Sequence, residues 1–286
     1  YRKPTQQLHL SFVPEYSSHK RHVADTFYGG YFENFKEDWT LESAGVYGGD
    51  LKSLDIHMHT MEAYTTLYEA THKEVHKRAL QEIIDIVLKH MVDYDFWCGR
   101  NQFSIDFTPK PAISIRRTWN YDRDPESANK NQLDTTSYGH NIELIWLLNR
   151  AYEVLGLPPA REFTRKFADY TLANGWDNIH GGIYRDGMHD GRIVVTDKEW
   201  WQNFESLTGF LDSYQATEDE RYLDTFIKLW EFDKKYFYNP EVGESRQLLL
   251  ADGTPVIDDT GNQWKCIYHT DRAMMECCLR IESLTE

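Results

Sequence analysis

The stretch SYGHNIELIW, residues 137–146, predicts a helix that is buried on most of its sides. Ser137 is a plausible N-cap, and apolar residues follow almost without a break from 142 to 148. His140 and Glu143 are three residues apart, so they share one face of this helix. A histidine and a carboxylate in the first turn of a buried helix must be satisfied. They either bond each other and the backbone, or they face a cavity.

The composition excludes several classes of partner. The chain has 286 residues and a net charge of −15, which argues against nucleic acids and anionic membrane surfaces. No apolar run is long enough to span a membrane, and the first residues do not form a signal peptide. Aromatic residues make up 14%, a richness that suits either a large core or a sugar-binding cleft.

The four cysteines are too few and too scattered for a disulfide framework. They are Cys98, Cys266, Cys277 and Cys278. Cys277 and Cys278 are adjacent in a helical pattern, where packing explains them better than a redox pair. We therefore predict a reducing, cytoplasmic location.

Hydrophobic periodicity predicts a chain made mostly of helical hairpins. Helices are expected at 54–90 in two pieces, 138–155, 159–173, 198–216, 219–236 and 269–283. Two short strands are expected within 98–118, a polar loop at 120–135, and a long Gly/Pro-marked connection at 238–264. No linker or charge block divides the chain, so residues 1–286 are interpreted as one all-α domain.

The spacing of three marked residues indicates a repeated architecture. His140, Glu205 and His269 are separated by 65 and 64 residues, about the length of two helices with their connections. If the hairpins close into a ring, every second helix lies inside, and all three side chains point into one central cavity.

A first cluster lies in KSLDIHMHTMEAY, residues 52–64. Asp55, His59 and Glu62 share one helical face. His57 and His59 would share a face only on a strand, and on a helix they are about 200° apart, so a metal site is disfavoured. The alternative for His59 is a core histidine bonded to Asp55 or Glu62.

A second cluster lies in DKEWWQNFESLTGFL, residues 197–211. Trp200, Trp201 and Glu205 suit a sugar site, because a pyranose stacks on an indole while a carboxylate accepts its hydroxyl protons. The alternative is a packed tryptophan beside a salt-bridged glutamate.

A third cluster lies in WKCIYHTDRAMMECC, residues 264–278. His269 stands at a helix start after Trp264, and Arg272 and Glu276 follow it. The pattern resembles the stretch around His140. Two histidines presented alike from two helices suit a two-base reaction on one substrate.

Two loops carry a Gly-Gly-aromatic turn ahead of lysine-containing helices: YGGYFE at 28–33 and HGGIYRDG at 180–187. Glycine permits the positive φ of tight turns, and such turns would line one mouth of the ring.

Taken together, these blocks resemble the N-acylglucosamine 2-epimerase superfamily, and within it the cellobiose (mannobiose) 2-epimerase branch. The resemblance runs from about residue 28 to the C-terminus and rests on KSLDIHMHTMEAY, SYGHNIELIWLL, GGIYRDG, KEWWQNFE and WKCIYH. It implies an (α/α)6 barrel with short β hairpins in its rim loops. It also implies an isomerase that acts at C2 of a sugar without a metal or other cofactor.

The resemblance also implies roles for single residues. His140 and His269 match the general base and general acid, and Glu143 matches the glutamate that tunes its neighbouring histidine. Trp264 and His59 match residues that contact the sugar. We expect the remaining sugar contacts from Asp55, Trp200, Trp201 and Glu205.

The chain departs from the family pattern in three ways. Asp55 stands where the family usually has Asn, and Asn203-Phe204 stands where it has Gln-Ala, which affects substrate choice. About seven of the twelve helices are present. The chain is thus expected to be the C-terminal two-thirds of a barrel, with the helix that carries the family's substrate-binding arginine before residue 1.

The sequence therefore predicts a sugar 2-epimerase that inverts C2 of a reducing-end aldose, of cellobiose, mannobiose or N-acylglucosamine type, through an enediolate. The alternatives are an aldose–ketose isomerase of the same superfamily and an inactive barrel that only binds sugar. A glycoside hydrolase is disfavoured because it needs two carboxylates as acid and base. The expected partner is a mono- or disaccharide, and the chain is expected to be a monomer or homodimer.

Overall fold

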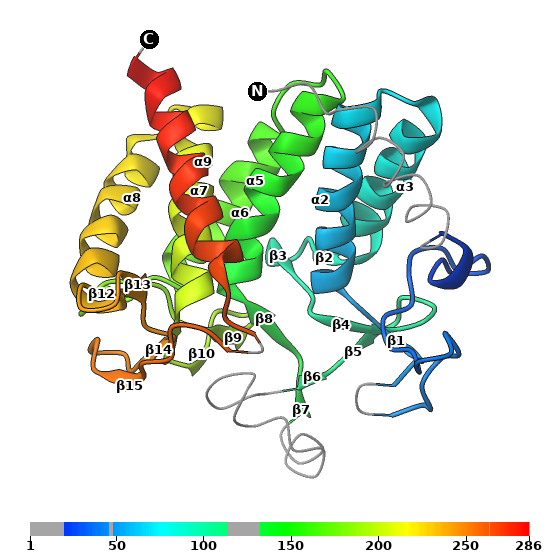
Figure 1. The fold of residues 1–286 in the computed structure, drawn as a ribbon, viewed down its shortest axis with the longest axis horizontal. Helices are drawn as coiled ribbons and strands as arrows, with labels where there is room; N and C mark the ends of the chain where they lie inside the picture. Colours follow the sequence, from blue (N-terminus) through cyan, green and yellow to red (C-terminus); the bar gives the residue numbers. More distant parts are fainter. Residues whose placement is uncertain (1–19, 46–47, 114–131, 263, 286) are drawn as a thin grey trace. The chain divides into compact units, whose positions relative to one another are not determined.

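The computed structural model describes residues 20–45, 48–113, 132–262 and 264–285 (Figure 1). Contacts divide the chain into two compact units. The first contains the residues up to Val92, Arg100–Ala112 and Leu147–Pro158, and the second contains Asp93–Gly99, Ile113–Trp146 and the chain from Pro159 onward. No helix within the described ranges combines the length and the apolar character that a membrane crossing requires.

The first unit is a helical hairpin with a small antiparallel sheet. Its elements are β1 (Leu51–Ser53), α2 (Leu54–Thr71), α3 (Glu74–His90), β4 (Gln102–Ser104) and β5 (Pro109–Lys110). The sheet order is β1-β4-β5, and α2 packs against α3. The Ser53 hydroxyl caps α2, and His72 ends it in the left-handed conformation. The helical segment predicted in two pieces over 54–90 is confirmed.

The second unit contains helices α6 to α9 and the part of α5 up to Trp146, while the rest of α5 belongs to the first unit. The helices are α5 (Tyr138–Val154), α6 (Arg161–Asn174), α7 (Trp200–Thr217), α8 (Glu220–Phe232) with the π-helical turn η1 (Asp233–Phe237), and α9 (Ile267–Thr285). They confirm the predicted helices, except that the one predicted at 219–236 changes to a π turn after Phe232.

Short antiparallel strands lie near the lower ends of these helices (Figure 1). One sheet is β8 (Thr135–Ser137), β9 (Asp186–Met188) and β10 (Ile193–Val195), and a second is β11 (Lys198–Glu199), β14 (Leu248–Leu249) and β15 (Pro255–Ile257). The other strands are β2 (Val92–Asp93), β3 (Cys98–Gly99), β6 (Ala112–Ile113), β7 (Gln132–Leu133), β12 (Tyr238–Asn239) and β13 (Glu244–Ser245). The predicted hairpins in the loops are confirmed, while residues 114–118 of the predicted strand region lie outside the described residues.

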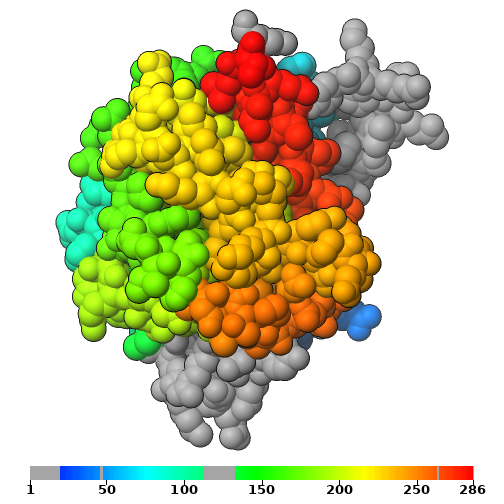
Figure 2. Space-filling view, turned by 90° about the vertical axis from the view of Figure 1, so that its left-hand side faces the viewer, coloured from blue at the N-terminus to red at the C-terminus, as the bar shows by residue number. Residues whose placement is uncertain are grey.

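Burial separates two kinds of helix in the second unit. Helix α7 is buried along almost its whole circumference and packs against α6, α8 and α9. Helix α8 buries only one face, and its other face forms much of the surface drawn in yellow in Figure 2. This alternation of an enclosed and a half-exposed helix is the pattern that the hairpin architecture predicts.

Two loops repeat one design around a buried lysine. Asp25 and Asp177 each accept the N–H groups two and three residues further on, at 2.9 and 3.1 Å in both loops. Two glycines with φ between 74° and 83° follow in each loop, as the Gly-Gly pattern predicts.

The lysines fix these loops to the starts of the buried helices. Lys52 and Lys198 are fully buried and lie 2.8 Å from Asp25 and Asp177, respectively. Each also donates to the carbonyl of the first glycine of its turn and to a carbonyl 53 residues further on. Each ammonium has three acceptors, which compensate for the cost of its burial. Because each lysine stands two residues before α2 or α7, these bonds attach the loop to the start of that helix.

Candidate functional site

Two glycines bring α5 and α7 into close contact. A Cβ on Gly139 would lie 2.4 Å from the Gln202 Cγ and 3.0 Å from the Trp201 Cζ3. A Cβ on Gly209 would lie 2.5 Å from the carbonyl oxygen of Ile142. Only glycine permits these approaches, which explains the glycine in the first turn of α5.

The predicted N-cap of α5 is confirmed. The Ser137 hydroxyl accepts the backbone N–H of His140 at 3.3 Å. The Gln202 amide of α7 donates to the same hydroxyl and to the carbonyl of Arg185, both at 3.1 Å. The first turn of α5 is therefore held from outside as well as capped, which fixes the position of His140.

The Trp201 ring contacts the rings of both His140 and His269. Its ring centroid lies 4.7 Å from that of His140 and 5.6 Å from that of His269. Trp200 also contacts His269, edge to face, at 6.2 Å. Both tryptophans are buried, so packing explains most of their surface, as the alternative interpretation predicted. The structure brings the clusters around residues 140, 200 and 269 together.

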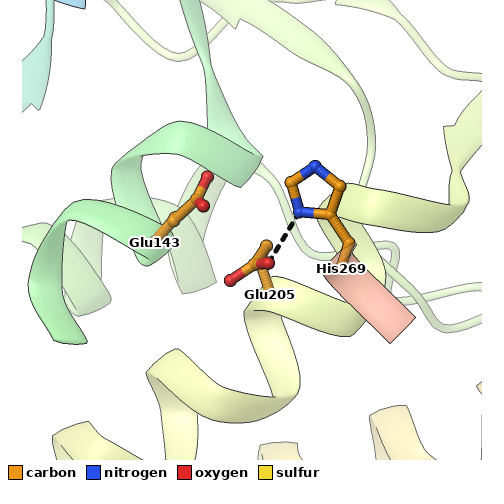
Figure 3. Close-up of side chains that lie close together, drawn as sticks. All are labelled: Glu143, Glu205 and His269. Atoms are coloured by element: carbon orange, nitrogen blue, oxygen red, sulfur yellow. Dashed lines mark hydrogen bonds and ion pairs between the residues drawn. The ribbon is translucent and has the colours of Figure 1, made fainter. Parts of the chain in front are cut away.

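Glu205 accepts hydrogen bonds from three side chains. Its Oε1 lies 2.7 Å from His269 Nδ1 and 2.6 Å from an Arg272 nitrogen, and its Oε2 lies 3.1 Å from Trp146 Nε1. Figure 3 shows the bond to His269. Burial alone would raise the pKa of Glu205, but the bond from His269 and the charge of Arg272 lower that pKa below its ordinary value. The carboxylate is therefore ionised, and His269 Nδ1 carries the proton.

Arg272 joins the second glutamate to this network. One of its terminal nitrogens lies 3.0 Å from Glu143 Oε1 as well as 2.6 Å from Glu205 Oε1. Its guanidinium lies over the rings of Trp146 and Tyr268, at 4.8 and 4.0 Å from their centroids, and it donates to the Tyr268 hydroxyl. Two buried carboxylates thus share one cation.

No role for Arg272 is predicted from the sequence. The available signal was its position three residues after His269, which puts both on one face of α9. Trp146 was also missed, although it lies three residues after Glu143 in the same way. The bonds that these residues make with Glu205 join positions 59 and 67 residues apart, so local spacing did not reveal them.

Glu143, Glu205 and His269 also form a group that could hold a metal ion, because their ligand atoms lie within 4.8 Å of one another (Figure 3). The Arg272 guanidinium already supplies positive charge to both glutamates. A metal ion would therefore have to compete with it for the same oxygens.

The described contacts of three further predicted site residues, and of His57, lie within their own units. In the first unit, His59 pairs with Glu62 at 3.0 Å and with Asp55 at 3.3 Å, as the alternative interpretation predicted. His57 is buried and accepts the Tyr31 N–H, and burial lowers the pKa of His57 to about 4. In the second unit, Trp264 is 40% exposed on the loop before α9. The sugar contacts predicted for His59, Asp55 and Trp264 stay predictions.

Asn203 occupies one of the positions at which the chain departs from the family pattern. Its Oδ1 accepts the Ile183 N–H and its Nδ2 donates to the Glu199 carbonyl, both at 2.9 Å. It therefore ties the glycine loop to the start of α7. Phe204 beside it is buried.

Comparison with known proteins identifies relatives of the whole arrangement. Residues 11–273 match the family model described as N-acylglucosamine 2-epimerase (GlcNAc 2-epimerase). A cellobiose 2-epimerase of Ruminococcus albus is 29% identical over 261 residues, which are 88% of this chain and 60% of that protein. An N-acylglucosamine 2-epimerase of Mus musculus is 29% identical over 144 residues, which are 49% of this chain and 34% of that protein.

A solved structure shows the same fold. The cellobiose 2-epimerase of Spirochaeta thermophila superposes with a TM-score of 0.78 at 26% identity, over 98% of this chain and 66% of that one. The expected fold class, the mostly helical (α/α)6 barrel fold, is thereby confirmed. The chain spans about 60% of the length of the curated cellobiose 2-epimerases it matches.

Proposed function

The chain belongs to the N-acylglucosamine 2-epimerase family, and from this we propose that it inverts C2 of a reducing-end aldose. The observation that carries the proposal is the buried Glu205 carboxylate, bonded to His269 and Arg272 beside an indole that contacts both imidazoles. Relatives named cellobiose 2-epimerase match 88% of this chain, and the murine N-acylglucosamine 2-epimerase matches half of it. A disaccharide of the cellobiose or mannobiose type is therefore the favoured substrate.

His269 is the better defined of the two proposed bases. Its Nδ1–H donates to Glu205, which leaves the Nε2 lone pair of the neutral imidazole free to accept the C2 proton. The imidazolium that forms is then stabilised by Glu205, as a carboxylate stabilises a catalytic histidine elsewhere. The C2 proton of the sugar is acidic because C2 is bonded to the carbonyl carbon of the open-chain form.

His140 serves as the second proton carrier. Protonation of the enediolate at C2 from the opposite face gives the epimer, and protonation at C1 gives the ketose. Trp201 contacts both imidazoles and thus sets their separation. Glu143 tunes His140 and shares Arg272 with Glu205. Trp200, Trp201, Trp264, His59 and Asp55 are the proposed sugar contacts.

Proton NMR in D₂O tests the reaction directly. The protein is mixed in turn with cellobiose, mannobiose and mannose. Deuterium at C2 together with the epimer would support the proposal. Ketose as the product would indicate the aldose–ketose isomerase, and a folded protein that exchanges no proton of any sugar would favour a barrel that only binds sugar.

Substitution of either histidine tests the two-base assignment. We expect His140→Ala and His269→Ala each to lower the rate of deuterium incorporation by about 10²-fold or more, because each removes a general acid–base group. His180→Ala is the matched control, since His180 lies outside this network and pairs with Asp177. Near wild-type incorporation in either site variant would contradict the assignment.

A further inference from the structure

The indole of Trp201 is held by α5 and by a hydrogen bond from its Nε1 to Glu199, a residue that the proposed mechanism does not use. Its Cζ3 edge faces Gly139 of α5, where a Cβ would lie only 3.0 Å away. Its Nε1 donates to Glu199 Oε2 at 2.9 Å. The ring that contacts both imidazoles therefore has one directional anchor among the contacts described, and that anchor is a carboxylate.

Glu199 itself is rigidly placed. It lies in β11, where it pairs with Leu248 of β14, and its carbonyl accepts the Asn203 side-chain N–H at 2.9 Å. Its side chain is buried, with the whole residue 1% exposed. The Oε1 atom has no hydrogen-bond partner among the described residues, so the bond to Trp201 is the one described hydrogen bond of the carboxylate.

We propose that Glu199 is a positioning residue that fixes the Trp201 indole against His140 and His269 through the Nε1–Oε2 hydrogen bond. It thereby sets the separation of the two imidazoles. This inference rests on the proposed function for its catalytic consequence, but the hydrogen bond can be tested without any sugar.

The charge around Glu199 makes the anchor sensitive to pH. Burial raises the pKa of Glu199 to about 7, the nearby charge of Arg185 opposes that rise, and Asp186 and Asp197 add to it. An ionised carboxylate is a stronger acceptor than a protonated one. The bond to the indole is therefore expected to tighten as the pH rises through neutrality.

Indole N–H resonances report this bond directly. Trp201 is observed in ¹⁵N-tryptophan-labelled protein and assigned with Trp201→Phe. Its indole proton is expected downfield, with a shift that titrates near pH 7. In Glu199→Met, which keeps the volume but loses the acceptor, the resonance moves upfield. In Glu199→Gln it stays hydrogen-bonded but loses the titration due to the carboxylate.

The neighbouring tryptophan supplies an internal control. Trp200 is as buried as Trp201, but its Nε1 has no hydrogen-bond partner among the described residues. Its resonance, assigned with Trp200→Phe, is expected to be the same in wild type, Glu199→Gln and Glu199→Met. A titration of Trp201 that persists in Glu199→Gln would come from the imidazoles and would overturn the assignment to Glu199. A Trp201 shift unchanged in Glu199→Met would overturn the anchor itself.

Kinetics separate the positioning role from the bond. Misplaced imidazoles are expected to lower kcat in Glu199→Met on the order of 10- to 100-fold, with a smaller change in KM and partial recovery in Glu199→Gln. A displaced indole with unchanged kcat would overturn the positioning role. A folded wild-type protein that epimerises no sugar would refute the proposed function, and the indole spectra would still decide whether Glu199 anchors Trp201.

Discussion

At the scale of single residues, the candidate site depends on the balance of charge around Glu205. The carboxylate is fully buried, and two of its three donors, His269 and Arg272, come from one helix, α9. An unpaired carboxylate in such a place would take up a proton. The bond from His269 and the guanidinium of Arg272 together keep it ionised, and the ionised form is the one that orients His269 and stabilises its charged state.

Replacement of Arg272 tests this balance. We expect Arg272→Met to raise the pKa of Glu205, because the charge that lowers it is gone. The acidic limb of the pH–kcat profile should then move to higher pH. The rate at neutral pH should fall by about 10²-fold, as when a preorganised donor is removed. Arg272→Lys keeps the charge without the planar fork, so it should recover the profile in part.

Arg280 is the matched control for this substitution. It lies two turns further along α9 and pairs with Asp212 at 3.1 Å, outside the Glu205 network. Arg280→Met should leave the pH profile where it is. An unshifted profile in Arg272→Met would mean that His269 alone keeps Glu205 ionised.

The sequence predicted that His140, Glu205 and His269 lie close together, but not which side chains bond there. The 64-residue interval placed Glu205 and His269 in one cavity, and the motif identified His140. The sequence predicts that Glu205 binds the sugar, whereas its described hydrogen bonds come from His269, Arg272 and Trp146. Such bonds depend on how α7 packs against α9, which no local pattern encodes.

At the scale of elements, the bounds of the helices were predictable, whereas the strands were predictable only as short hairpins in the loops. Periodicity placed the helices to within a few residues, since each runs for 13 residues or more. The strands have two or three residues, which is too short for alternation to be recognised. After Phe232 the π turn η1 contacts α7 and β14, and the local sequence carries no sign of these contacts.

The buried lysine of the second unit makes a prediction about these elements. Lys198→Met removes the cation that joins Asp177, the glycine turn and the Ala251 carbonyl. It should lower the free energy of unfolding by about 3–5 kcal/mol, because a buried carboxylate loses its buried cation. Urea unfolding followed by circular dichroism measures the change.

Lys234 is the matched control. It is 43% exposed in its side chain and pairs with Glu231 on the same helical segment. Lys234→Met should change the free energy of unfolding by less than about 0.5 kcal/mol. Equal effects of the two substitutions would show that the buried contacts of Lys198 do not stabilise the fold.

At the scale of the whole molecule, one turn occurs four times among the described residues. Asp25, Asp93, Asp177 and Asn239 each accept the N–H two residues on with the side chain, and the N–H four residues on with the carbonyl. The fourth residue always has positive φ, and it is glycine in three loops and Trp97 in the other. The backbone geometry of the turn repeats but its residue types do not, so only the two Gly-Gly loops could be recognised in the sequence.

The residue two positions before each helix, and the side chain that it pairs with, differ among the four turns. Lys52 and Lys198 stand two residues before α2 and α7, and Lys265 stands two residues before α9, where it pairs with Glu244. Before α5 that position is Thr136, and Asp93 pairs with His189 instead. The aspartate–lysine pairs therefore belong to two of the four turns, one in each unit.

These two pairs predict how stability depends on pH. Burial would raise the pKa of Asp25 and Asp177, but the lysine and the backbone N–H groups outweigh it and lower both pKa values. A lowered carboxyl pKa contributes stability that is complete above the unfolded value of about 3.9 and is lost as the pH falls through the folded value. The wild-type protein should therefore lose free energy of unfolding steadily below about pH 4.

Asp25→Asn and Asp177→Asn isolate this contribution in the first and the second unit. Each keeps the size and the acceptor oxygen but removes the charge opposite the lysine. At pH 6 each should be less stable than wild type by about 3 kcal/mol or more, since it leaves a buried ammonium unpaired. The difference should shrink as the pH falls below about 4, because the aspartate of the unfolded wild-type chain then takes up a proton more readily than the folded carboxylate does. Urea titrations across this range measure the difference, and a difference that stays constant with pH would show that the aspartates act by shape and not by charge.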